Sequence, residues 1–205
     1  MIRAVTTTSL LALLILVLYL PSAYPPQHFI EQLRIEHALT TAFWGHDHAM
    51  RILARMLDWQ TTATQASLVA SAADAPGPID VAVAKQIAEA NHRLFNNPYF
   101  RSIDTLLALA AYRLSVLVEW LPVLLVFMLA ALFDGYLLRI VKSKEFVQHN
   151  PEVFALHICA AIMTACAAVL ALVLPITLHP LMLSAAPVAI SVFACRALAD
   201  FHRRD

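Results

Sequence analysis

Four apolar stretches constrain the fold of this chain more than any other feature of its sequence. They span residues 4–20, 115–133, 153–174 and 181–196. A helix needs about 20 mostly apolar residues to cross a hydrocarbon core that is about 30 Å thick. Because the stretches are close to that length, we expect an all-α integral membrane protein with four transmembrane helices. The polar residues between the first and second stretches are expected to form a helical extracytoplasmic domain.

The composition agrees with a membrane protein and excludes several other classes. Hydrophobic residues make up 60% of the 205 residues and charged residues 14%, whereas a soluble domain is about one quarter charged. The 14 Lys and Arg residues are balanced by 14 Asp and Glu residues, so no net positive charge attracts nucleic-acid phosphates. With three glycines in the chain, a glycine-rich loop that cradles a nucleotide phosphate is excluded.

These patterns divide the chain into four segments. We expect an N-terminal transmembrane anchor (residues 1–20), a helical extracytoplasmic domain (21–104), a long second transmembrane helix with a cytoplasmic extension (105–144), and a transmembrane helical hairpin with a basic tail (145–205). The first stretch also resembles a signal peptide that is cleaved after Ala23. Pro21 is a poor match to the small residue that such a cleavage site needs, so we favour an uncleaved anchor that ends at Pro21.

Basic residues in the short loops predict the orientation of the chain. They follow the second apolar stretch and lie in the C-terminal tail, as Arg139, Lys142, Lys144, Arg203 and Arg204. The loop at residues 175–180 contains no Lys or Arg. Because short cytoplasmic loops are enriched in basic residues, both termini are expected in the cytoplasm and residues 21–104 on the opposite side.

The extracytoplasmic segment has the spacing of apolar residues that is typical of helices. A first helix is expected to end at Gly45, which suits the cap position after a helix. In a second helix, Met50, Leu53 and Leu57 form one apolar stripe, with Ile52, Met56 and Trp59 beside it. A third, short helix is expected from Asp80 to Leu94.

The third and fourth apolar stretches are expected to form a helical hairpin. Pro175 and Pro180 both prevent a continuous helix through the short segment between the stretches. Small residues recur four positions apart on the third stretch, at Ala160, Thr164 and Ala168. Small side chains allow helices to approach closely in lipid, so we expect them to pack within the hairpin.

One group of polar residues has the chemistry of metal ligands: His37, His46, Asp47 and His48. Imidazole and carboxylate groups bind zinc and manganese. Adjacent residues of a helix point about 100° apart, so His46 and His48 would converge on one ion only in a turn. The alternative is a polar turn between two helices with exposed histidines. Because the spacing matches no closed ligand set, we expect no metal and no cofactor.

Glu119 is the acidic residue inside the second apolar stretch. A carboxylate within a membrane span is a candidate for proton or ion transport. It lies close to the outer end of the stretch, beside Trp120, which is typical of a membrane interface. The alternative is therefore an interfacial carboxylate that is hydrogen-bonded to Tyr112. At the inner end of the same stretch, Asp134 is expected to pair with Arg139 or with the basic residues that follow it.

The C-terminal half resembles a known family. Three features carry the resemblance: the sequence from Phe133 through Asp134 and Gly135 to Arg139, the pair Phe154 and His157, and the segment Leu174–Leu181 with Pro175, His179 and Pro180. They are similar to the domain of unknown function 4400 family, membrane proteins of conjugative plasmids and integrating conjugative elements. The resemblance covers residues 105–205 and implies a place in the bacterial inner membrane, with residues 21–104 in the periplasm. It brings no catalytic residue with it.

The leading functional hypothesis is a non-enzymatic inner-membrane component of a conjugative DNA-transfer apparatus, built from type IV secretion and coupling proteins. It would act by helix packing and scaffolding. Its expected partners are membrane lipid and other conjugation proteins such as a coupling ATPase, with no direct contact to nucleic acid. The alternatives are a small transporter or channel subunit that uses Glu119, and a metal-dependent membrane enzyme at His37, His46 and His48.

Overall fold

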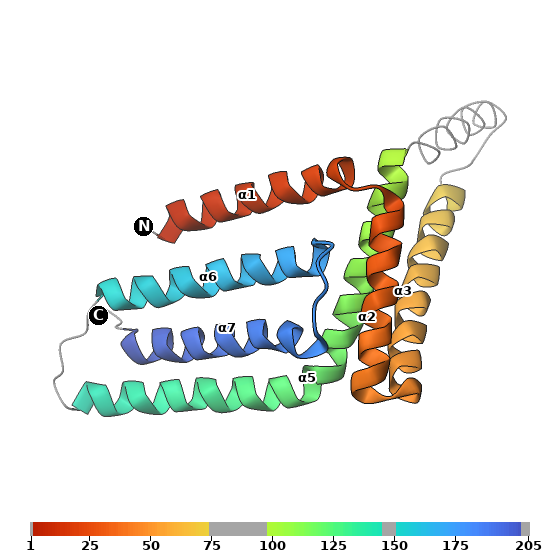
Figure 1. The fold of residues 1–205 in the computed structure, drawn as a ribbon. Coiled ribbons are helices and arrows are strands. Elements are labelled where there is room, and N and C mark those ends of the chain that lie inside the picture. The colour runs from red at the N-terminus through yellow and green to blue at the C-terminus, as the bar shows by residue number, and fades with distance from the viewer. Residues whose placement is uncertain (1, 74–97, 145–150, 202–205) are drawn as a thin grey trace. The chain divides into compact units, whose positions relative to one another are not determined.

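The computed structural model describes residues 2–73, 98–144 and 151–201, and these residues form α-helices and short connections without a β-strand. The helices are α1 (Ile2–Ala23), α2 (Pro26–Trp44), α3 (His46–Ala73), α5 (Pro98–Lys144), α6 (Pro151–Val173) and α7 (Pro180–Asp200) (Figure 1). Four of them, α1, α5, α6 and α7, are long and apolar enough to cross a membrane. The all-helical fold is therefore confirmed, whereas the short helix expected from Asp80 to Leu94 lies outside the described residues.

The chain separates into two compact units. The α2–α3 unit comprises Leu18–Ser115 together with Pro175–Thr177, so it takes in the first part of α5 and the turn between α6 and α7. The apolar-helix unit comprises residues 1–17, 116–174 and 178–205. Each unit has its own packing and its own polar contacts.

In the α2–α3 unit, α2 and α3 form a hairpin through Gly45. Its φ angle is 86°, a left-handed conformation that favours glycine, and its N–H donates a hydrogen bond to the carbonyl of Thr41 at 2.9 Å. The expected cap is therefore confirmed. Asp47 lies in the first turn of α3, where a carboxylate is favoured by the helix dipole.

One of the two neighbouring apolar stripes of α3 is buried. The structure buries Ala49, Ile52 and Met56, while Met50 and Leu57 are 44% and 48% exposed. The stripe with Ile52 and Met56 is therefore the inner one. Both stripes have helical spacing and lie about 100° apart on the helix, so only the position of the neighbouring helices decides which one is buried. Ser115 marks the contact with α5, since its Oγ donates to the carbonyl of Ile52 at 2.9 Å.

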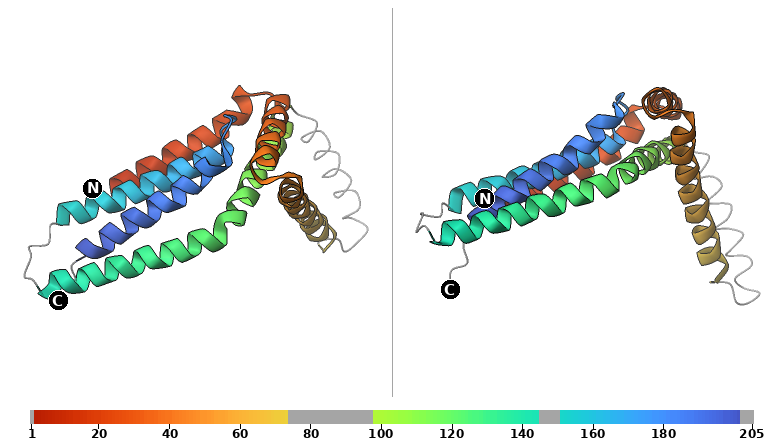
Figure 2. Two further views of the ribbon diagram at one scale, coloured as in Figure 1. Left: turned by 60° about the horizontal axis from the view of Figure 1, so that its bottom comes forward. Right: turned by 90° about the horizontal axis from the view of Figure 1, so that it is seen from below.

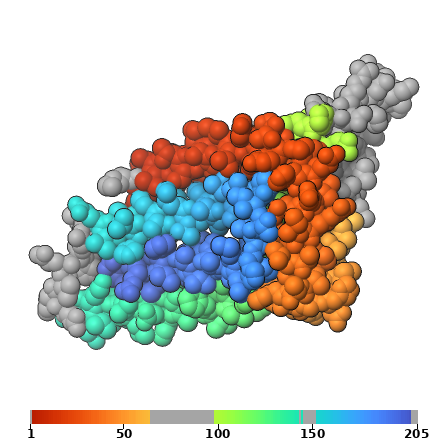
Figure 3. All heavy atoms as spheres, in the orientation of Figure 1, coloured from red at the N-terminus to blue at the C-terminus, as the bar shows by residue number. Residues whose placement is uncertain are grey.

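In the apolar-helix unit, α6 and α7 pack against each other along their length, as the space-filling view shows (Figure 3). α1 runs beside α6 (Figure 2), where Ser9 Oγ lies 3.7 Å from Met163 Sδ. The hairpin expected around Pro175 and Pro180 is thus confirmed as a pair of packed helices. α1 continues through Pro21 to Ala23, so the expectation that Pro21 ends this helix is wrong.

α5 approaches α7 closely at Gly135. A Cβ atom at this position would lie 2.6 Å from the carbonyl oxygen of Cys195, closer than real Cβ contacts allow. By contrast, the residues at 121–130 are exposed except for the half-buried Leu124. α5 therefore contacts α7 near its C-terminal end and presents an apolar surface before it.

Candidate functional site

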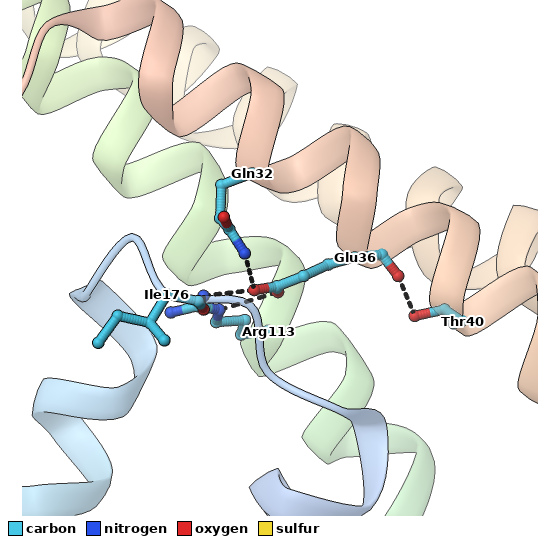
Figure 4. Close-up of polar contacts among 5 residues, drawn as sticks. All are labelled: Gln32, Glu36, Thr40, Arg113 and Ile176. Carbon is cyan, nitrogen blue, oxygen red and sulfur yellow. Dashed lines mark hydrogen bonds and ion pairs between the residues drawn. The ribbon is translucent and has the colours of Figure 1, made fainter.

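A buried ion pair lies at the centre of the α2–α3 unit. Arg113 of α5 and Glu36 of α2 are 0% and 3% exposed. Arg113 Nε donates to Glu36 Oε2 at 2.9 Å, and Arg113 Nη2 donates to the other carboxylate oxygen, so the contact is bidentate (Figure 4). Gln32 Nε2 also donates to Glu36 Oε1, at 3.1 Å. A planar guanidinium matches a carboxylate in this way and fixes the orientation of both groups.

The same guanidinium binds the turn between α6 and α7. Arg113 Nη2 donates to the backbone carbonyl of Ile176 at 2.7 Å. One side chain therefore contacts a residue of α2 and a residue of the turn, as Figure 4 shows. We call Gln32, Glu36, Thr40, Arg113 and Ile176 the Arg113 cluster.

The sequence of α2 explains the polar side of this cluster. Gln32, Glu36 and Thr40 lie four residues apart, so they share one helix face, and all three are buried. Thr40 Oγ1 satisfies its hydrogen bond locally, by donating to the carbonyl of Glu36 at 2.8 Å. The inner face of α2 is thus polar, and its charge is compensated by Arg113 from α5.

Tyr112, beside Arg113 in the sequence, borders the cluster. Its hydroxyl oxygen lies 3.4 Å from Nδ1 of His37. Tyr112 precedes the apolar stretch 115–133, and its side chain is 1% exposed. The structure thus places this hydroxyl beside His37, a neighbour that the sequence did not suggest.

Glu36 and Arg113 could not be recognised as a pair from the sequence, because the two residues are 77 positions apart. Two signals were present in the sequence. Arg113 is the single basic residue between positions 102 and 138, and Gln32, Glu36 and Thr40 recur at the spacing of one helix face. Neither signal identifies the partner, because pairing depends on how α2 and α5 pack.

A second group of contacts joins α5, α6 and α7 near the end of α5. Cys195 Sγ lies 3.8 Å from Asp134 Oδ2, and the guanidinium carbon of Arg139 lies 5.0 Å from the ring centre of Phe201. Asp134 was expected to pair with Arg139 or with the basic residues that follow it, and in the structure Asp134 and Arg139 each have a partner on or just after α7. Phe154 of α6 contacts the same Phe201 ring, with 5.7 Å between ring centres.

Asp200 lies at the end of this second group of contacts. Lys142 Nζ is 2.5 Å from Asp200 Oδ1, and His157 Nδ1 is 3.8 Å from Asp200 Oδ2. The side chains of Lys142 and Asp200 are 35% and 17% exposed. An ion pair that water reaches stabilises a fold weakly. The close contact at Gly135 is therefore expected to matter more for the packing of α5 than this ion pair.

The remaining candidate residues have separate surroundings. Glu119 is half-buried in α5. The Nδ1 atom of His48 contacts Arg51, while His46 and Asp47 are exposed. Among the residues that the structure describes, no three His, Cys, Asp or Glu side chains form a group that could hold a metal ion. In the hairpin, Nδ1 of His179 accepts a hydrogen bond from the N–H of Leu181 at 3.3 Å and so caps the start of α7.

Comparison with known families identifies the family of the chain. Residues 34–202 match a family model described as IncC plasmid conjugative DNA transfer protein DtrJ-like. The chain belongs to the DtrJ-like family. Within this family match lie both ends of the Glu36–Arg113 pair, the Ile176 turn, and the contacts of α5 with α7. No curated protein and no solved structure is significantly similar to the chain.

Membership of the DtrJ-like family confirms the expected connection with conjugative DNA transfer. The family that matches is the DtrJ-like family, which differs in name from the domain of unknown function 4400 family expected from the C-terminal motifs. The match also begins earlier than that resemblance, at residue 34 instead of residue 105. It therefore includes most of α2 and all of α3, where the C-terminal motifs gave no information.

Proposed function

We propose that the protein is a non-enzymatic inner-membrane component of a conjugative DNA-transfer apparatus, in which it acts as a scaffold. The observation that carries this proposal is the DtrJ-like match over residues 34–202, which includes three of the four apolar helices. A conjugative transfer protein with helices of this length has the inner membrane as its natural location.

The proposed topology follows from the charges of the short loops. α1, α5, α6 and α7 cross the membrane, both termini lie in the cytoplasm, and residues 21–104 lie in the periplasm. A single cysteine introduced at exposed Ala38 should react with a membrane-impermeant maleimide in intact spheroplasts, once the native cysteines are replaced. Labelling that occurs only after lysis would contradict the topology.

The polar contacts of the structure support a scaffolding role. The charged groups of Glu36 and Arg113 bind each other, and Arg113 also binds a backbone carbonyl. Ser115 and Arg55 connect α3 to α5 by donating to backbone carbonyls. Arg55 Nη1 donates to the carbonyl of Ser115 at 3.2 Å. These groups orient helices, which is the work of a structural protein.

The proposed partners are membrane lipid and other inner-membrane conjugation proteins, such as a coupling ATPase, with no direct contact to nucleic acid. The apolar surface of α5 at residues 121–130 supports this choice, because most of its side chains are exposed within the chain. In a bilayer, acyl chains or the helices of a partner cover such a surface.

The test of this function is a clean deletion in a donor strain. We expect transfer of the conjugative element to fall to the detection limit, while the growth rate of the donor stays unchanged, because the protein serves only the transfer apparatus. Transfer frequency and growth are measured in parallel, and a plasmid-borne copy of the gene should restore transfer. A deletion strain that transfers at the normal frequency would contradict the proposal.

A further inference from the structure

The turn between α6 and α7 is held by a side chain from another part of the sequence. We infer that Arg113 is a positioning residue that clamps the turn Pro175–Thr177 to α2 and α5, with Glu36 as the group that orients it. Arg113 lies 63 positions before Ile176, whose backbone carbonyl it binds at 2.7 Å. This inference goes beyond the proposed function and stands whether or not the protein takes part in DNA transfer.

The carbonyl of Ile176 is bound by a donor from outside the turn. Pro175 and Pro180 lack an N–H, and residues 174–179 belong to neither α6 nor α7. The carbonyl of Ile176 takes its hydrogen bond from the guanidinium of Arg113. The position of this carbonyl is therefore set by α5.

Glu36 makes the clamp rigid. Both carboxylate oxygens bind the guanidinium, through Nε and Nη2, and the pair is buried. Nη2 is also the atom that binds Ile176. A guanidinium held at two points keeps little freedom, so its donor to the turn has a fixed direction. In a buried site with little water, these charge-assisted hydrogen bonds are stronger than at the surface.

The covalent chain carries the effect of the clamp to two apolar helices. α6 ends at Val173 and α7 begins at Pro180, so each lies within a few residues of the clamped turn. Fixing Ile176 therefore restrains the adjoining ends of both helices. The clamp thus connects α2, α5 and the turn Pro175–Thr177.

The experiment measures the distance between the turn and α2 in the full-length protein reconstituted in lipid nanodiscs. Nitroxide labels are attached to cysteines at Thr177 and Ala38, both exposed, after Cys159, Cys166 and Cys195 are replaced by alanine. Double electron–electron resonance then gives the distribution of distances between the two labels. A narrow distribution is expected for the otherwise native protein.

The deciding variant exchanges the two charges, Glu36→Arg with Arg113→Glu. It retains an ion pair between α2 and α5 but replaces the donor to Ile176 with a carboxylate, which repels a carbonyl oxygen. We expect the distribution of distances between Thr177 and Ala38 to become about twofold wider, because a turn without this hydrogen bond moves over larger distances. An unchanged width in this variant would overturn the inference.

A control pair of labels separates release of the turn from unfolding. Labels at exposed Ala38 and Ala54 report on the α2–α3 hairpin, which Arg113 does not hold through Ile176. Their distribution should remain narrow in the charge-exchanged protein. If it also widens, the neutral double variant Glu36→Leu with Arg113→Met decides by the same two distances, since it removes the donor without leaving a buried charge. Lys142→Ala, which alters a distant ion pair, should leave both distributions unchanged.

Discussion

Replacing Arg113 by methionine is expected to lower the free energy of unfolding by about 3–5 kcal/mol. The substitution leaves the carboxylate of Glu36, which is 3% exposed, buried without its counter-charge. It also removes the hydrogen bond to the carbonyl of Ile176. Thermal and denaturant unfolding of the purified protein in detergent micelles measures the loss.

Two controls make this prediction specific to the buried pair. The double variant Glu36→Leu with Arg113→Met should recover most of the loss, because apolar residues of similar volume often replace a buried ion pair at little cost. Lys142→Ala should cost less than about 1 kcal/mol, since its ion pair with Asp200 is partly exposed. If Arg113→Met costs no more than Lys142→Ala, the central place given to the buried pair is wrong.

Replacing Gly135 by valine is expected to lower the free energy of unfolding by about 1–3 kcal/mol and to separate α5 from α7 at this close contact. Even the Cβ atom of a larger residue would lie 2.6 Å from the carbonyl oxygen of Cys195 and 3.0 Å from its Cα. These are backbone atoms, which cannot move aside as the end of a flexible side chain can. The hydrogen-bond contact between Cys195 and Asp134, at 3.8 Å, should be lost with the packing.

The matched control for this prediction is Ala130→Val. It introduces the same residue into the same helix, five positions earlier, where the side chain is exposed. Unfolding in micelles and the rate of Cys195 modification by a small thiol reagent are compared for the two variants. Gly135→Val should be less stable and react faster, and equal behaviour of the two proteins would contradict the close packing.

The features that the sequence predicted well are those with local causes. Pro175 and Pro180 lack the N–H that a continuous helix needs, and Gly45 alone suits its left-handed cap. The four apolar stretches are long enough to form helices whatever their neighbours are. Each of these features depends on a few adjacent residues, so it can be predicted from the sequence without knowing how the helices pack.

The features that it missed depend on packing between distant segments. Glu36 and Arg113 are each compatible with an exposed position on a helix, and only the approach of α2 to α5 makes them a buried pair. The two neighbouring apolar stripes of α3 have the same period, so the sequence does not decide which one is buried. The structure buries the stripe with Ile52, because α5 packs there through Ser115.

The most direct test of the central claim, that this protein of the DtrJ-like family serves transfer through helix packing, compares two variants in the deletion donor. One variant removes the candidate chemical groups, by His37→Gln, His46→Gln, His48→Gln and Glu119→Gln. The other is Gly135→Val. Transfer frequency is measured in both, with the protein level determined by immunoblot.

We expect the variant without these chemical groups to transfer at nearly the wild-type frequency, whereas Gly135→Val should transfer far less. Loss of transfer in the four-residue variant at a normal protein level would contradict scaffolding and favour transport or metal chemistry.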